Sequence, residues 1–201
     1  MGAQNAGMAT LLPLPTSAQA TRSAALHAAP AAGLDEPFEL LAACHERVKH
    51  SLALLLKLIA HAEQHGPDAQ AAEAARDVLR YFNLAAPLHH EDEERHLLPL
   101  LYASERAELV EAAEQMSADH LTFRALWAEL AIGLQTLADG QLPEDLPRLR
   151  REAESFTTLH DSHLALEDKL VFPAAASLAG PATRQTMSSD MAARRGVNLL
   201  R

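Results

Sequence analysis

Apolar positions recur at helical spacing along most of this chain and predict four long helices. From about residue 35 onward, leucine, alanine and other apolar residues return every three or four positions, which is the period of one helix face. Capping residues and Gly or Pro stop signals divide the pattern into segments at residues 35–65, 68–101, 104–138 and 145–180. The loops between them are short, so neighbouring helices should run antiparallel. The sequence therefore predicts an all-α, up-down-up-down four-helix bundle over residues 34–180.

Each predicted helix begins at a residue whose side chain can accept hydrogen bonds from free backbone N–H groups: Asp35, Asp68, Ser104 and Asp145. Pro87 falls inside the second helix and removes one backbone hydrogen bond, which predicts a local kink.

The two ends of the chain do not share the helical pattern of the middle. Residues 1–33 are rich in Ala, Pro, Ser and Thr without an apolar period, which predicts a disordered leader. Residues 181–201 are only weakly amphipathic, and we expect a C-terminal tail or a short helix there.

Composition narrows the class of protein. The 201 residues have a formal net charge of -10, which argues against nucleic-acid binding, and no apolar run reaches membrane-spanning length. Cys44 is the single cysteine, so neither a disulfide framework nor a thiolate zinc cluster is available. A cytoplasmic protein is the simplest expectation.

Two similar motifs suggest the chemistry. In HHEDEERHLLP, His89 precedes Glu93 by four residues, and in HLALEDKLVFP, His163 precedes Glu167 by four. In both motifs an acidic residue follows the Glu directly, and a Pro comes six residues after it. Residues four apart share a helix face, so each motif offers one imidazole and one carboxylate side by side. Such pairs on two helices can hold two borderline metal ions such as iron.

The other two helices each supply one histidine at a matching height. Counted from the shared end of the predicted bundle, His45, His89, His120 and His163 should lie within roughly 8 Å of one another in height at 1.5 Å per residue. Seven residues from each of them, on the same face, come four large apolar side chains that should cover the site and restrict access to small apolar molecules. These are Leu52, Phe82, Trp127 and Phe156.

The remaining polar residues of the first motif have plainer expected roles. His90, Glu91, Asp92 and Glu94 lie off the predicted ligand face, which predicts a solvated acidic surface.

The ordered set of a His, His-x-x-x-Glu, a His and a second His-x-x-x-Glu resembles the hemerythrin-like, HHE cation-binding domains. The resemblance covers roughly residues 35–179 and implies a pair of non-haem iron ions (Fe2+/Fe3+), joined by an oxo or hydroxo bridge. It implies terminal imidazole ligands at His45, His89, His120 and His163, and bridging carboxylates at Glu93 and Glu167.

One ligand of the family's oxygen carriers is missing from this sequence. Those proteins use five histidines, two of them one turn apart on the third helix, but the residue one turn after His120 is Arg124. His160, one turn before His163, is the best replacement as a metal ligand, and the alternative is a solvent-facing histidine or one that contacts a ligand.

Three functions are compatible with such a site. The first is a protein that binds or senses O2 or a related small molecule such as NO. The second is a diiron oxidoreductase acting on peroxide or nitric oxide, or a supplier of iron for cluster repair. The third is a metal that mainly stabilises the bundle. A ferritin-like oxidase is disfavoured, since Glu-x-x-His occurs at Glu93 and His96 but nothing equivalent precedes His163.

Overall fold

The computed structural model describes residues 36–197, and these residues are helical almost throughout, without a strand. The all-α class is thereby confirmed. The predicted leader and the proposed cap at Asp35 lie outside the described residues. None of the described helices is long and apolar enough to cross a membrane.

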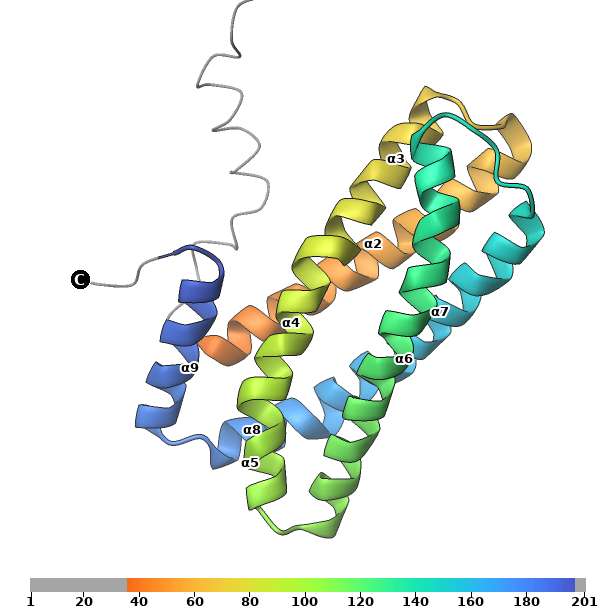
Figure 1. The fold of residues 1–201 in the computed structure, drawn as a ribbon. Helices are drawn as coiled ribbons and strands as arrows, with labels where there is room; N and C mark the ends of the chain where they lie inside the picture. Colours follow the sequence, from red (N-terminus) through yellow and green to blue (C-terminus); the bar gives the residue numbers. More distant parts are fainter. Residues whose placement is uncertain (1–35, 198–201) are drawn as a thin grey trace, which may run out of the picture. The chain divides into compact units, whose positions relative to one another are not determined.

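Four long helical stretches pack around a common core (Figure 1). The first is α2, and the second runs from α3 to α5 through two π-helical turns, η1 and η2. The third is α6, and the fourth runs from α7 through the π turn η3 to α8. Their bounds are α2 Pro37–His65, α3 Ala69–Arg80, η1 Tyr81–Ala85, α4 Ala86–Asp92, η2 Glu93–Leu97, α5 Leu98–Ala103, α6 Ala107–Ala138, α7 Leu146–Leu166, η3 Glu167–Val171 and α8 Phe172–Leu178.

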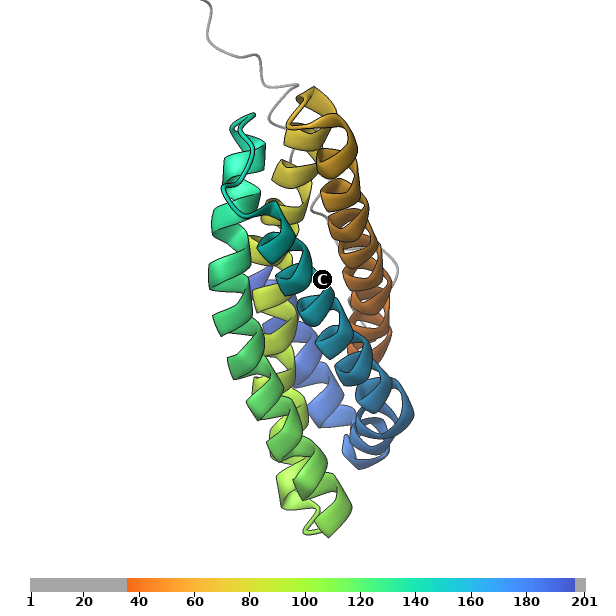
Figure 2. The same cartoon turned by 90° about the vertical axis from the view of Figure 1, so that its right-hand side faces the viewer.

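The packing order follows the order along the chain. Helix α2 contacts α3 and α7, and α6 contacts α3 and α7 in turn, so the four stretches form a closed ring of neighbours. Figure 2 shows α7 between α6 and α2 when the molecule is viewed from the side. Leu and Phe side chains from all four stretches fill the interior, including Leu55, Phe82, Leu130 and Phe156.

The helix starts agree with the capping signals at two positions and disagree at one. Asp68 accepts a hydrogen bond from the Ala71 N–H, and Asp145 accepts one from the Arg148 N–H, both at 2.8 Å. Ser104 does not cap α6, because its hydroxyl donates to the Leu101 carbonyl at the end of α5 and α6 begins only at Ala107.

Each π turn ends two residues before a proline: Pro87, Pro99 and Pro173. A proline lacks an N–H, and its ring clashes with the carbonyl one turn earlier in a regular α-helix. Widening the preceding turn relieves this clash while the helix continues. The distortion predicted at Pro87 therefore takes the form of a π turn. Glu93 and Glu167 are the first residues of η2 and η3, so both carboxylates begin a widened turn.

A further helix, α9 (Pro181–Arg194), follows the fourth stretch, so the described chain has five helical stretches where four were predicted to form the bundle. Helix α9 packs against the beginning of α2 and against α4 (Figure 1). Its own side chains Met187 and Met191 are buried.

Candidate metal centre

Four histidines and two glutamates from the four long stretches meet in the core. They are His45 of α2, His89 of α4, His120 of α6 and His163 of α7, with Glu93 and Glu167 at the starts of η2 and η3. Each of the six side chains is at most 2% exposed. The residues predicted from one histidine per helix and from the two His-x-x-x-Glu motifs are thus neighbours in space.

Each glutamate faces two imidazoles, one with each carboxylate oxygen. Glu93 Oε1 lies 3.1 Å from His89 Nε2, and its Oε2 lies 3.3 Å from His120 Nε2. Glu167 Oε2 lies 3.0 Å from His45 Nε2, and its Oε1 lies 3.2 Å from His163 Nε2. Both carboxylates therefore connect the His45 and His89 side of the centre to the His120 and His163 side.

These contacts divide the donors into two groups of the size that a metal ion needs. Cluster A comprises His45, His89, Glu93 and Glu167, and cluster B comprises His90, Glu93, His120 and His163. Within each cluster, one ligand atom per residue lies within 4.8 Å of all the others. The clusters share Glu93, which is the arrangement expected for two ions joined by a carboxylate.

The donor atoms fit a cation better than they fit one another. Nε2 of three histidines and all four oxygens of the two glutamates are buried without a hydrogen bond, although the distances between them are short. Buried carboxylate oxygens without donors are costly, and the lone pairs of these atoms converge on the same space. Positive ions between them would remove that cost. The three histidines are His45, His120 and His163.

Carboxylates on the far side of the rings orient three of the four imidazoles. In each, Nδ1–H donates to an acidic side chain and leaves Nε2 directed at the clusters, the usual arrangement around metal-binding histidine. The pairs are His45 with Asp168 at 2.8 Å, His120 with Glu94 at 3.0 Å and His163 with Asp119 at 3.1 Å. His89 Nδ1 is buried without such a partner.

The sequence contained a signal for two of these orienting carboxylates. Glu94 directly follows Glu93, and Asp168 directly follows Glu167. In both motifs the first acid faces the clusters, and the second accepts a hydrogen bond from a histidine of another helix. Asp119, one residue before His120, had no comparable repeat to reveal it.

Burial favours the neutral, metal-binding form of two of these imidazoles. It lowers the pKa of His89 to about 3 and the pKa of His120 below its ordinary value. Burial opposes the charged form of His163 as well, but its contacts with Glu167 and Asp119 raise its pKa.

The two glutamates split in pKa because they share one buried space. Burial and the neighbouring Glu167 raise the pKa of Glu93 well above its ordinary value. Burial also opposes ionisation of Glu167, yet the adjacent imidazoles of His163 and His45 hold its pKa well below the ordinary value. A cation between the two glutamates would favour the ionised form of Glu93.

Two further histidines, His160 and His90, lie near the clusters. His160 is buried, but its Nδ1–H donates to the Phe156 carbonyl at 2.9 Å, and the residue belongs to neither cluster. His90, expected on a solvated surface, belongs to cluster B, and its ring centroid lies 4.3 Å from that of His120. The surface expectation is wrong for His90 because α6 covers its ring with His120 and Phe123.

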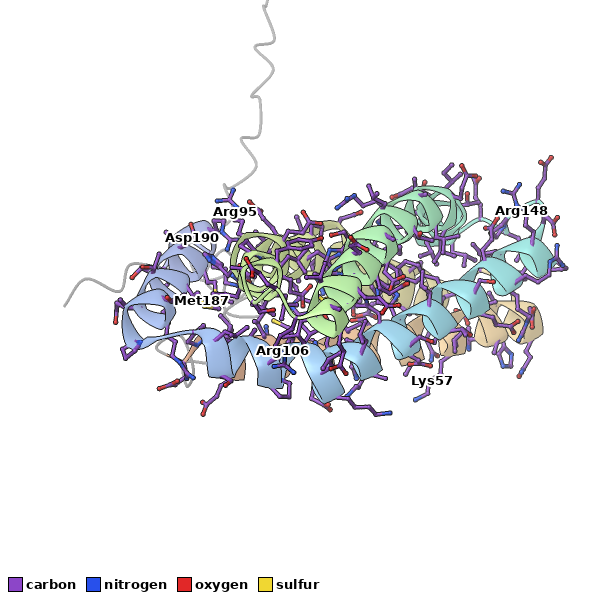
Figure 3. All side chains as sticks on the ribbon, turned by 90° about the horizontal axis from the view of Figure 1, so that it is seen from below. Lys57, Arg95, Arg106, Arg148, Met187 and Asp190 are labelled. Carbon is purple, nitrogen blue, oxygen red and sulfur yellow. The ribbon has the colours of Figure 1, made fainter. Side chains whose placement is uncertain are left out.

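The surface expectation is also wrong for Asp92, which is fully buried. Helix α9 covers it and neutralises its charge, because Arg194 and Arg195 both donate to its carboxylate, the latter at 2.5 Å. His96 also contacts α9, because its Nε2 lies 2.8 Å from Oδ2 of Asp190. Figure 3 shows Asp190 on α9 close to Arg95 of the second stretch. Helix α9 thus fixes the segment that contains Glu93 from outside.

A pocket of about 170 Å³ lies beside cluster B. Phe82, Trp127 and Phe156, three of the four residues predicted to cover the site, line it together with His90 and His160. Leu52 is buried in the core but does not line the pocket.

Comparison with known proteins agrees with this geometry. Residues 36–175 match the family model described as the hemerythrin HHE cation binding domain. An uncharacterized protein of Haemophilus influenzae is 32% identical over 136 residues, which are 68% of this chain and 77% of the relative.

Proposed function

The chain belongs to the family of hemerythrin HHE cation-binding domains, and from this we propose that it is a non-haem diiron protein that binds or senses O2 or a related small molecule such as NO. The observation that supports two ions best is the pairing of both glutamates with histidines on two sides, since each oxygen of Glu93 and of Glu167 faces a different imidazole. Imidazole and carboxylate donors in this ratio suit iron.

We assign the six donor residues to the two ions as follows. His45 and His89 would hold one iron, His120 and His163 would hold the other, and Glu93 and Glu167 would contribute carboxylate oxygens to the centre. The iron pair, when bound, supplies the electrons that a diatomic ligand draws on.

The side chains around these donors orient the imidazoles and determine which molecules reach the centre. Asp168, Glu94 and Asp119 keep three imidazoles aligned through their Nδ1–H groups. The aromatic walls of the pocket favour small apolar molecules over water and larger solutes.

A diiron oxidoreductase that acts on peroxide or nitric oxide is the second candidate. The observation that favours it is that His160, the predicted fifth imidazole ligand, belongs to neither cluster of donors. A centre with fewer protein ligands has more open coordination positions on the metal for substrates, whereas reversible binding of one small molecule needs only one.

Optical spectra of the ferrous protein separate these functions. Reversible binding predicts a new absorption band on adding O2 or NO that disappears when the gas is removed. Rapid oxidation with repeated turnover of peroxide or NO would instead establish the enzyme. No spectral response to any of these molecules would leave the metal a purely stabilising role.

A further inference from the structure

His90 is held differently from four of the five other imidazoles near the clusters. The fifth, His89, also lacks a hydrogen bond at Nδ1, but it is only 2% exposed and does not line the pocket. His45, His120 and His163 each donate to a carboxylate, and His160 donates to a backbone carbonyl. Within residues 36–197, the contacts of the His90 ring are ring packing alone, with no hydrogen bond. A histidine without such a partner is neither fixed in orientation nor made more basic.

His90 is also the residue shared by cluster B and the pocket. One of its ring nitrogens lies within 4.8 Å of ligand atoms of Glu93, His120 and His163, and its side chain lines the pocket. It is only partly buried, whereas the other three members of the cluster are at most 2% exposed. His90 therefore stands between the donors and the space through which a molecule can approach them.

The size and walls of the pocket define what can approach. Its volume of about 170 Å³ is close to that of an engineered apolar cavity of about 150 Å³ that binds benzene or xenon. Aromatic rings of Phe82, Phe123, Trp127 and Phe156 form much of its wall. The polar groups Glu94 and Arg124, which are paired at 3.3 Å, also line it. The pocket therefore has room for a small molecule beside His90.

We propose that His90 is an exchangeable fifth imidazole ligand, which occupies a position on the ion of cluster B and yields it to a small molecule arriving through the pocket. This inference rests on the proposed diiron function. His90 can leave because no hydrogen bond restrains its ring, and the pocket beside it can accept the ring as it turns away. His160 cannot play this part, since its Nδ1–H bond to the Phe156 carbonyl fixes its ring and it belongs to neither cluster.

The exchange would set the apparent affinity of the centre. As long as His90 occupies the coordination position, an added ligand must compete with it. The measured dissociation constant is then the intrinsic constant divided by the fraction of molecules in which His90 has left the position. Removing the imidazole should therefore tighten the binding of added ligands without removing the metal.

The test compares the full-length wild type with His90→Gln and with the matched control His160→Gln. Glutamine preserves much of the side-chain volume, so the pocket is not enlarged. Iron per chain, the azide dissociation constant of the ferric protein, and the visible spectrum of the cobalt(II)-substituted protein are measured for each. Cobalt absorption strengthens as the number of ligands falls.

For His90→Gln we expect unchanged iron content, stronger cobalt absorption and an azide dissociation constant lowered about tenfold, if about one wild-type molecule in ten is open. His160→Gln should leave all three near the wild-type values. Unchanged azide affinity and cobalt spectrum in His90→Gln would show that His90 is not a ligand, and loss of iron would show that it is a permanent one. Equal effects of both variants would assign the change to pocket polarity. The wild-type iron content reports separately on the proposed diiron function.

Discussion

The acid stability of the metal-free protein should depend strongly on His160. This side chain is buried among aromatic rings, and burial lowers its pKa from 6.5 to about 4. In the unfolded chain the imidazole regains its ordinary pKa, so between these two values the unfolded state binds more protons than the folded state. The contribution of His160 to stability is therefore complete above pH 6.5 and is lost progressively as the pH falls toward 4.

The size of the effect follows from the pKa difference. One pKa unit corresponds to about 1.4 kcal/mol, so the shift of His160 makes the free energy of unfolding fall by about 3 kcal/mol across this pH range. His160→Gln removes the titrating group while its amide can still donate to the Phe156 carbonyl. Other buried histidines titrate in both proteins, so the difference between the two isolates His160.

The assay is urea unfolding followed by circular dichroism, with a chelator present, at several pH values between about 7 and 4. The variant should lose less stability than the wild type on acidification, and the gap between the two should change by about 3 kcal/mol in favour of the variant. Parallel stability curves for the two proteins would refute the reasoning, because they would mean that His160 is protonated as readily in the folded as in the unfolded state.

Two other sets of variants test the metal centre and its support. Glu93→Ala removes a carboxylate shared by both clusters and should lose at least one iron per chain. Glu94→Ala should keep the iron stoichiometry at saturation but weaken metal binding by roughly 10- to 100-fold, because His120 loses its orienting partner. Elemental analysis and metal titration measure these two effects. Equal iron loss from the Glu93 and Glu94 variants would contradict these assignments. Asp92→Ala should lower the free energy of unfolding by about 3–5 kcal/mol, because the guanidinium groups of α9 lose a fully buried partner. A loss below about 1 kcal/mol in urea unfolding would mean that α9 separates easily from α4.

Much of the centre could be predicted because local rules determine it. Histidine and glutamate four residues apart must share a helix face, and one histidine per helix at one height brings the donors of four antiparallel helices together. The prolines after Glu93 and Glu167 were visible in both motifs, but the π turns they cause were not predicted. Those turns alter the phase of the helix beyond each glutamate, so the faces assigned to later residues on a regular helical period were unreliable.

The errors at Asp92 and His90 concern contacts between segments far apart in the chain. When its helix is considered alone, Asp92 is predicted to lie on the surface. It is buried because α9 packs over it and Arg194 and Arg195 donate to its carboxylate. The weak apolar pattern of α9 gave little sign of this docking. His90 was misplaced for a similar reason, since packing against His120 and Phe123 of α6 decides its environment.

Iron content per chain tests the central claim most directly. Protein produced in iron-replete cells and purified without chelators should contain about two irons per chain, because two carboxylates each join two imidazole-bearing sides of one buried centre. Elemental analysis that finds a single, tightly held zinc ion in place of two irons would contradict the diiron assignment.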